Sequence, residues 1–323
     1  MIQFNLPQEL IAQAPAQPRD SARLLVYDRK TKSIIDTVFS ELPKYLTADT
    51  TLVLNNSKVE HCRWLFEDGK TEIFVLQKLD QYTVRAMVRP GRKFKIGKSL
   101  HMLDWLDIET TAIDGDGIRT LRLNVQHDDP RLLRYEHVPL PPYIEQNDDL
   151  ADEYQTVYAK PLGSKAAPTA GLHFTDELLA KIEDEHEILE VTLHVGLGTF
   201  APLTDAQIQA GTLHEEFYEI SPVVLEKLTA SRHITTVGTT TTRTLESWKR
   251  SNQTSGFTDI FIQPGYKFQA VDSMVTNFHL PGTSLLLMIE AFIGSEEETQ
   301  KIYDHAIKER YRFYSFGDAM LIL

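Results

Sequence analysis

Two histidines in the second half of the chain stand in loops built from small and polar residues. His173 shares its loop with Thr169, and His279 shares the stretch of residues 272–284 with Asn277. An imidazole can accept or donate a proton near neutral pH, which makes either histidine a candidate for acid–base catalysis, with Thr169 as a hydroxyl partner. An ordinary turn that leads into a capped helix would also explain each loop taken alone.

Two further loops could bind charged or electron-rich groups. Residues 192–200 are predicted to form a strand whose second face, which includes His194, is small and polar and suits a ligand pressed against a sheet. A run of four threonines that begins with Thr239 and Thr240 follows another predicted strand and continues into Arg243 and a helix. Backbone N–H groups and hydroxyls at a helix N-terminus favour anions. Simple N-capping is the alternative role for one of these threonines.

Positive charge is concentrated in two places on an acidic chain. The net charge of −13 argues against a protein that coats nucleic acid over its whole surface. Around Arg312, however, cations alternate with aromatic residues, which is typical of base stacking combined with phosphate contacts, although the end of an amphipathic helix is the other explanation. The cations of the second concentration could contact phosphates, or they could lie on solvated strand faces joined by a turn. They are Arg85, Arg89, Arg92, Lys93, Lys95 and Lys98.

Several kinds of protein are excluded by what the sequence lacks. The single cysteine, Cys62, excludes an intramolecular disulfide and a multi-cysteine zinc site. The chain begins without the charged and apolar regions of a signal peptide, and its apolar runs are too short to span a bilayer, so we expect a cytoplasmic protein. It also contains no Gly-x-Ser-x-Gly, His-Glu-x-x-His or phosphate-loop motif.

The elements that must position these loops follow two different patterns. Residues 1–63 and 151–323 mix short strands with helices, and one early strand ends in the exposed amides of Asn55 and Asn56. Residues 64–150 contain only strands separated by turns, which is typical of a small all-β barrel or sandwich. We therefore predict a mixed α/β fold in which both ends of the chain form a large catalytic domain and the middle forms an inserted all-β domain.

Short motifs occur in a fixed order along nearly the whole chain. They are Leu6-Pro7, Arg19-Asp20, Leu52-Val53-Leu54-Asn55-Asn56-Ser57-Lys58-Val59, Arg89-Pro90-Gly91-Arg92-Lys93, Pro139-Leu140-Pro141-Pro142-Tyr143-Ile144, Tyr154-Gln155-Thr156-Val157-Tyr158-Ala159, residues 168–175, residues 192–200, and Phe316-Gly317-Asp318-Ala319-Met320. In this order they resemble the family of S-adenosylmethionine:tRNA ribosyltransferase-isomerases of queuosine biosynthesis. Glu153 stands where that family usually has arginine.

The resemblance implies an unusual use of S-adenosylmethionine. Its ribosyl unit is transferred to the 7-aminomethyl group of preQ1, a 7-deazaguanine at the tRNA wobble position, and is isomerised to give epoxyqueuosine-tRNA. Adenine and methionine are released. The resemblance implies no cofactor beyond this co-substrate and no metal, and we expect a monomer. It also implies a barrel-like mixed-sheet large domain with an inserted small β-barrel domain.

The implied reaction needs a base beside the sulfonium, for which His173 or His279 is suited, together with Thr169. We expect the substrate to be bound by Arg19, Asp20, Asn55, Asn56, His194, Thr239, Thr240, Arg243, Asn277 and Asp318. We expect the tRNA to be bound by Arg89, Arg92, Lys93, Lys95 and Arg312. A same-fold paralogue with a different acceptor and a non-catalytic RNA-binding relative are the alternative functions.

Overall fold

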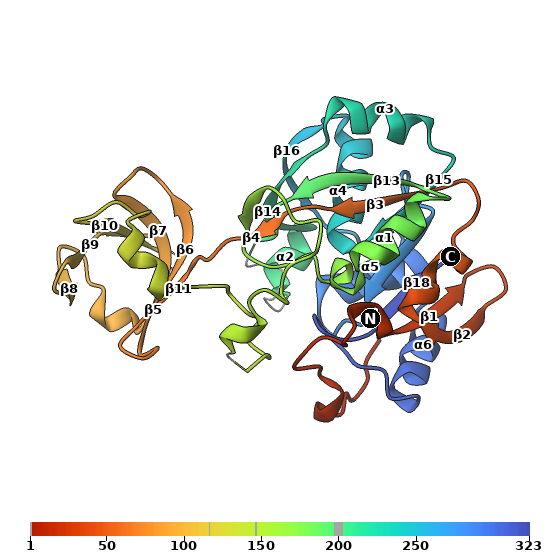
Figure 1. Cartoon of the computed structure of the whole chain (residues 1–323), viewed down its shortest axis with the longest axis horizontal. Coiled ribbons are helices and arrows are strands. Elements are labelled where there is room, and N and C mark those ends of the chain that lie inside the picture. Colours follow the sequence, from red (N-terminus) through yellow and green to blue (C-terminus); the bar gives the residue numbers. More distant parts are fainter. Residues whose placement is uncertain (1, 116, 146, 197–202) are drawn as a thin grey trace. The chain divides into compact units, whose positions relative to one another are not determined.

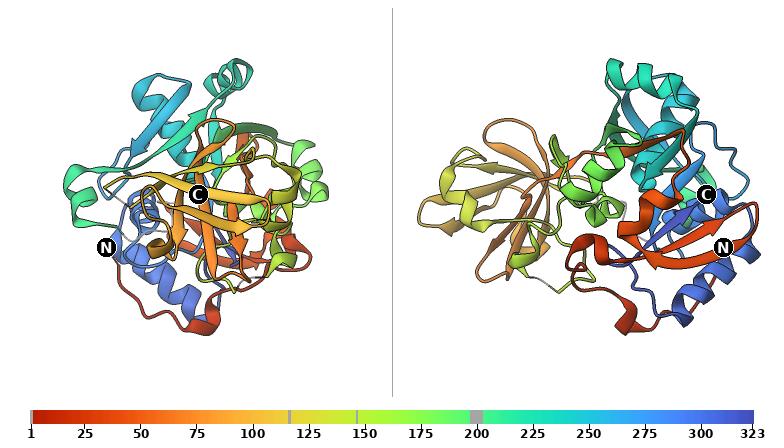
Figure 2. Two further views of the ribbon diagram at one scale, coloured as in Figure 1. Left: turned by 90° about the vertical axis from the view of Figure 1, so that its left-hand side faces the viewer. Right: turned by 45° about the vertical axis from the view of Figure 1, so that its right-hand side comes forward.

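A computed structural model describes residues 2–115, 117–145, 147–196 and 203–323. The chain forms two compact units, which Figures 1 and 2 show in colours that follow the sequence. The first unit comprises Met1–Val59 and Pro141–Leu323, and the second comprises Glu60–Leu140. The last part of the predicted loop at 192–200, from residue 197 onward, lies outside the described residues.

The unit boundaries differ from those predicted at residues 64 and 150. Residues that follow Pro141 belong to the large unit because their side chains and backbone bond to it. The Tyr143 hydroxyl lies 2.6 Å from Oγ of Ser315, and the Tyr143 carbonyl accepts a hydrogen bond from Gln13. The large unit therefore resumes at Pro141, ten residues before the predicted boundary at residue 151.

A nine-stranded mixed sheet forms the centre of the large unit (Figure 1). Four neighbouring strands (β13, β3, β15 and β17) are parallel. β18 pairs antiparallel with β17 and parallel with β1, and the remaining pairs towards the two edges are antiparallel. β3 is buried along its whole length, which explains why its three apolar residues, Leu52, Val53 and Leu54, are consecutive rather than alternating with polar ones. The strand order is β16 (Ser255–Ile260), β14 (Thr212–Glu219), β13 (Glu187–Leu193), β3 (Thr50–Asn55), β15 (His233–Val237), β17 (Ser273–Asn277), β18 (Ala319–Ile322), β1 (Arg23–Asp28) and β2 (Ser33–Val38).

Two apolar clusters cover the two faces of this sheet. Along β3, Leu52 and Leu54 point into one cluster and Val53 points into the other, as the two-residue period of a strand requires. The helices that supply the covering residues begin at side-chain caps in most cases; Thr175, for example, accepts a hydrogen bond from the Leu178 N–H. The helices are α1 (Asp176–Glu183), α2 (Asp205–Ala210), α3 (Pro222–Ala230), α4 (Thr239–Ser251), α5 (Ser284–Ile293) and α6 (Glu296–Lys308).

Short 3-10 helices connect the strands in both units. Those of the large unit are η1 (Gln8–Leu10), η2 (Arg19–Ser21), η3 (Phe39–Tyr45), η6 (Asp148–Leu150) and η7 (Thr169–His173), and a two-stranded sheet pairs β4 (Lys58–Val59) with β12 (Leu162–Ser164). The small unit adds η4 (Gly91–Lys93) and η5 (Pro130–Tyr135). No helix in the described part of the chain has the length and apolar composition needed to cross a membrane.

The small unit is an antiparallel half-barrel around one apolar core. Trp64 and Phe66 are almost fully buried in this core, which also contains Cys62. The prediction of a mixed α/β fold with an all-β insertion is therefore confirmed. The strand order is β11 (Glu136–His137), β5 (Arg63–Phe66), β6 (Thr71–Lys78), β7 (Thr83–Arg89), β10 (Arg119–Leu123), β9 (Leu106–Ile113) and β8 (Ser99–Leu103).

Close packing at Gly171 leads to a testable prediction about stability. A Cβ at this position would overlap the Tyr158 hydroxyl, which is buried and has no hydrogen-bond partner among the described residues. We expect Gly171→Ala to lower the free energy of unfolding by about 1–3 kcal/mol, because side chains in a packed core must shift. Gly115→Ala, where a Cβ meets nothing within 4 Å, is the matched control. Chemical denaturation measures both.

The same experiment tests the cause of the loss. Tyr158→Phe removes the overlapping oxygen without opening a large cavity, so the double variant Gly171→Ala/Tyr158→Phe should recover part of the lost stability. A double variant no more stable than Gly171→Ala would show that the hydroxyl is not the obstacle.

Candidate active site

A cavity of about 470 Å³ lies within the large unit. It opens where β15 and β17 end, and the carboxyl ends of parallel strands are the usual ligand site of such sheets. η7, the first turn of α4 and the loop between β17 and α5 all contribute to its wall. Its polar and titratable lining residues are Tyr143, Thr169, Thr239, Thr240, Thr276, Asn277, His279, Thr283, Tyr314 and Ser315.

A chain of hydrogen bonds runs from the cavity wall into the core. The Thr169 hydroxyl donates to Oδ1 of Asn277 at 3.1 Å, and Nδ2 of Asn277 lies 3.3 Å from Nε2 of His173. The amide donates to that ring nitrogen when the imidazole is neutral. His173 is buried against Phe39, with ring centroids 4.9 Å apart, and does not line the cavity.

The environment of His173 keeps its ring uncharged. Burial, followed by the positive charges of Arg312 and Arg19, lowers the pKa of His173 to about 3. The neutral imidazole therefore acts as a hydrogen-bond partner of Asn277 at neutral pH and has no direct access to a bound ligand.

His279 is the histidine that faces the cavity. Its Nδ1 is buried and has no hydrogen-bond partner among the described residues. Burial lowers the pKa of His279 to about 4, so the ring is unprotonated at neutral pH. A neutral imidazole that lines a cavity is able to accept a proton from a ligand.

The N-terminus of α4 forms another part of the wall. Gly238, with φ of 89°, precedes the helix without a side-chain cap, so the first-turn N–H groups remain available to a ligand. Thr239 and Thr240 line the cavity, whereas the hydroxyls of Thr241 and Thr242 bond back to carbonyls one turn earlier. The threonine run therefore divides into a ligand-facing pair and a helix-stabilising pair.

Asn55 and Asn56 do not line the cavity; they bind the strands around it. Asn55 is fully buried, and its amide donates to the carbonyl of Leu193 at 3.0 Å and to Oγ1 of Thr240 at 3.2 Å. Asn56 donates to Glu190 at 3.0 Å. Asn55 thus holds the cavity residue Thr240 in position although it does not line the cavity itself.

His194 and Arg243 also have partners outside this cavity. Nδ1 of His194 lies 2.7 Å from the Ser57 hydroxyl, and its ring stacks on Phe217 with centroids 6.0 Å apart. Arg243 forms a buried ion pair with Glu216. Neither side chain lines the cavity that contains Thr169 and His279.

Arg19 and Asp20 lie in η2, away from the cavity lining. Arg19 forms an ion pair with Glu153 at 2.9 Å and donates to the Gln155 carbonyl at 2.6 Å. The half-buried Asp20 side chain belongs to the same turn. Glu153 therefore neutralises a neighbouring cation.

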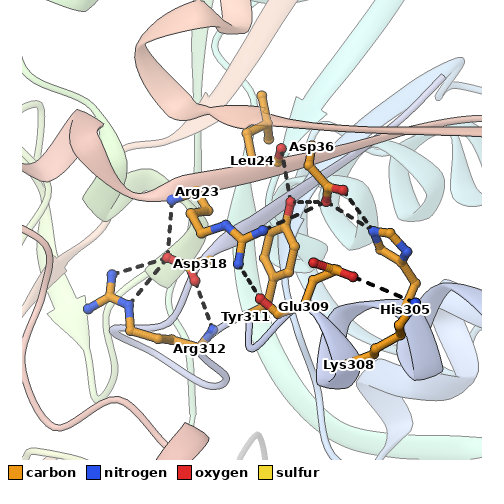
Figure 3. Close-up of polar contacts among 9 residues, drawn as sticks. All are labelled: Arg23, Leu24, Asp36, His305, Lys308, Glu309, Tyr311, Arg312 and Asp318. Carbon is orange, nitrogen blue, oxygen red and sulfur yellow. Dashed lines mark hydrogen bonds and ion pairs between the residues drawn. The ribbon is translucent and has the colours of Figure 1, made fainter.

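Arg312 and Asp318 belong to a polar cluster beside α6, which Figure 3 shows. Asp318 is 2% exposed and accepts hydrogen bonds from the backbone N–H groups of Arg23 and Arg312 and from the Arg312 guanidinium. Nearby, Asp36 accepts from the Tyr311 hydroxyl at 2.5 Å. Asp318 therefore organises the C-terminal loop rather than facing the cavity.

The cations predicted to bind tRNA differ in whether they already form ion pairs within the protein. Arg89 pairs with Glu72 at 3.1 Å, and Lys93 pairs with Glu67. Arg92 and Lys95 are exposed and have no ion-pair partner among the described residues. These two remain available for phosphate contacts.

Two tyrosines of the cavity wall were not among the predicted site residues. The rings of Tyr143 and Tyr314 lie 3.9 Å apart between centroids and line the same cavity. Burial raises the pKa of the Tyr143 hydroxyl, which keeps it protonated. The Pro-Pro-Tyr motif was the available signal, but nothing in the sequence indicates that it packs against the C-terminal loop.

Among the described residues, no group of three or more His, Cys, Asp or Glu side chains is arranged to hold a metal ion.

Comparison with known proteins defines the family. Residues 1–322 match the model of the family described as queuosine biosynthesis protein. A relative from Thermotoga petrophila, named S-adenosylmethionine:tRNA ribosyltransferase-isomerase, is 44% identical over 99% of this chain and 98% of its own. A relative of the same name from a Sulfurihydrogenibium species is 42% identical with the same coverage.

A solved structure gives the same result for the fold. The crystal structure of S-adenosylmethionine tRNA ribosyltransferase from Thermotoga maritima shares 37% identity, covers 99% of both chains and superposes with a TM-score of 0.58. Sequence and structure agree over essentially the full length, and the chain belongs to the queuosine biosynthesis protein family.

Proposed function

We propose that this protein is an S-adenosylmethionine:tRNA ribosyltransferase-isomerase. It transfers the ribosyl unit of S-adenosylmethionine to the 7-aminomethyl group of preQ1 at the tRNA wobble position and isomerises it, giving epoxyqueuosine-tRNA, adenine and methionine. The observation that carries this proposal is the cavity beyond β15 and β17, which combines an unprotonated histidine with an open helix N-terminus in a chain similar along its length to enzymes of that name. Neither a different acceptor nor a non-catalytic role is favoured by these features.

We assign the proton-accepting step to His279. Its imidazole faces the cavity and is neutral, whereas His173 lies behind Asn277 and reaches a ligand only through that amide. Thr169 presents its hydroxyl at the wall, oriented by the same amide. In this proposal His173 is a positioning residue, and Thr169 and Asn277 bind the polar edges of the nucleoside.

We propose that the helix N-terminus at Thr239 and Thr240 binds an electron-rich part of the substrate, because both residues line the cavity and no side chain caps the helix there. The reaction then needs proton transfer and polar contacts, which these side chains can supply, so we propose that it proceeds without a metal or redox cofactor. We also propose that the enzyme is a monomer. Its tRNA substrate supports a cytoplasmic location.

The proposed reaction is tested by following adenine and methionine release. With S-adenosylmethionine and preQ1-bearing tRNA we expect release of both products, and with tRNA that lacks preQ1 we expect background only. A chelator should change the rate by less than about two-fold, because no step uses a Lewis acid. Equal release with both tRNAs would contradict the assigned acceptor, and loss of activity that added metal restores would contradict the metal-free reaction.

Replacement of His279 tests the assigned base. We expect His279→Ala to lower kcat by about 10²–10⁴-fold, the usual contribution of a positioned base. His101→Ala, at an exposed histidine of the small unit, is the matched control and should retain activity. A larger loss in His173→Ala than in His279→Ala would transfer the role to His173.

The pH dependence follows from the lowered pKa of His279. A base acts in its unprotonated form, so activity falls as the pH drops through its pKa, which is about 4 rather than the usual 6.5. We expect kcat/KM to be flat between about pH 5.5 and 7.5. An acidic limb centred near pH 6.5 would contradict a buried, cavity-facing base.

The free cations of the small unit lead to a prediction about tRNA binding. We expect Arg92→Glu/Lys95→Glu to weaken tRNA affinity about ten-fold and to reduce the slope of log K against log salt by about 2, because two phosphate contacts are lost. Lys181→Glu/Lys267→Glu makes the same change in net charge at exposed sites of the large unit and is the control. Filter binding at several salt concentrations measures both; equal losses would indicate a general charge effect.

A further inference from the structure

Arg243 has an unused hydrogen-bonding edge in the interior of the large unit. The residue is 6% exposed, and its Nη1 donates to the equally buried carboxylate of Glu216. Its Nε and Nη2 are buried and have no hydrogen-bond partner among the described residues. Buried guanidinium N–H groups are almost always paired, so two unpaired ones on the same edge indicate a missing partner.

Arg243 lines a small chamber. Its volume is about 30 Å³, which is room for roughly two water-sized atoms. His214, Gln207 and Ser284 are among its polar lining residues, together with both members of the ion pair. The chamber therefore places polar side chains beside apolar ones such as Leu213 and Met288, and its volume matches the two oxygens of a carboxylate.

The chamber adjoins the main cavity. Leu285 lines both spaces, so the two are neighbours at this side chain. On α4, Thr239 lines the cavity and Arg243 follows four residues later, on the same face of the helix and about 6 Å further along its axis. The methionine tail of S-adenosylmethionine spans about 5 Å from sulfur to carboxyl carbon, given four bonds of ordinary length.

We propose that this chamber binds the carboxylate of the methionine tail of S-adenosylmethionine. Nε and Nη2 of Arg243 donate to the two carboxylate oxygens, in the side-on arrangement that suits a guanidinium. This inference rests on the proposed function, since it assigns one end of that substrate to a separate subsite.

The charges that line the chamber favour a carboxylate with an ammonium beside it, as in an α-amino acid, over an anion that has no positive group. Glu216 places a negative charge next to the Arg243 guanidinium, and it is also bound by the backbone N–H of Gly196 at 2.8 Å. An α-amino acid carries an ammonium beside its carboxylate, so the buried pair presents the opposite charge to each. A phosphodiester has only negative charge, which the Glu216 carboxylate would repel.

The test compares S-adenosylmethionine with decarboxylated S-adenosylmethionine, which lacks only the carboxylate. Adenine release with preQ1-bearing tRNA gives kcat/KM for both compounds. In the wild type we expect S-adenosylmethionine to be preferred by about 30-fold, as for a charge-assisted bidentate contact. In Arg243→Lys, which keeps the charge beside Glu216 but loses the planar fork, the preference should fall to about three-fold or less, with the loss confined to the carboxylated compound.

A second variant controls for misfolding that a change at the buried ion pair could cause. Ser284→Val narrows the chamber without removing a charge and should reduce the preference in the same direction, mainly through KM. Glu216→Gln keeps the Arg243 edge and should retain a preference of at least about ten-fold. The melting temperature of each variant shows whether it is folded.

The outcomes separate this inference from the proposed function. Wild-type turnover of both compounds with equal kcat/KM would overturn the carboxylate subsite while leaving the proposed reaction intact, and it would indicate that water fills the chamber. A preference that persists in both Arg243→Lys and Ser284→Val would also overturn it. No adenine release from S-adenosylmethionine by the wild type would instead overturn the proposed function.

Discussion

The site depends on the parallel pairing of β15 with β17. Val237 lies opposite Val275, and the Gly238 N–H extends the ladder by donating to the Val275 carbonyl at 2.8 Å. Because the two strands run in the same direction, the helix that follows one and the loop that follows the other leave the sheet at the same edge. This pairing brings Thr239 beside Asn277, and a one-residue shift would turn the side chains of one strand to the opposite face.

Buried polar groups around the cavity hold its wall in place. Asn55 reaches from β3 to Thr240, and Asn277 connects Thr169 to His173. Each such bond satisfies a group that would be unfavourable to bury alone, so the arrangement is specified as a unit. Desolvation has a second effect here: it keeps both His173 and His279 uncharged, which separates the role of a hydrogen-bond partner from that of a proton acceptor.

Local sequence signals predicted the cavity better than they predicted the roles of individual residues. Thr169, Thr239 and His279 stand in loops between regular elements, and such loops gather at the edge of the sheet. Asn55 and His194 also stand at strand ends, yet their side chains turn toward neighbouring strands and bond there. The sequence shows that a polar side chain ends a strand, but the direction of that side chain depends on the partner strand and its register.

By itself, the sequence determined that the chain is a mixed α/β protein with an all-β insertion, because strand and helix periods are local properties. Its collinear motifs also determined the family. Only the tertiary structure decided that His173 is enclosed while His279 faces the cavity, and that Tyr143 meets Tyr314. It also decided that Arg243 keeps one edge unpaired. These properties depend on contacts between segments far apart in the chain, and burial then sets the protonation of each group.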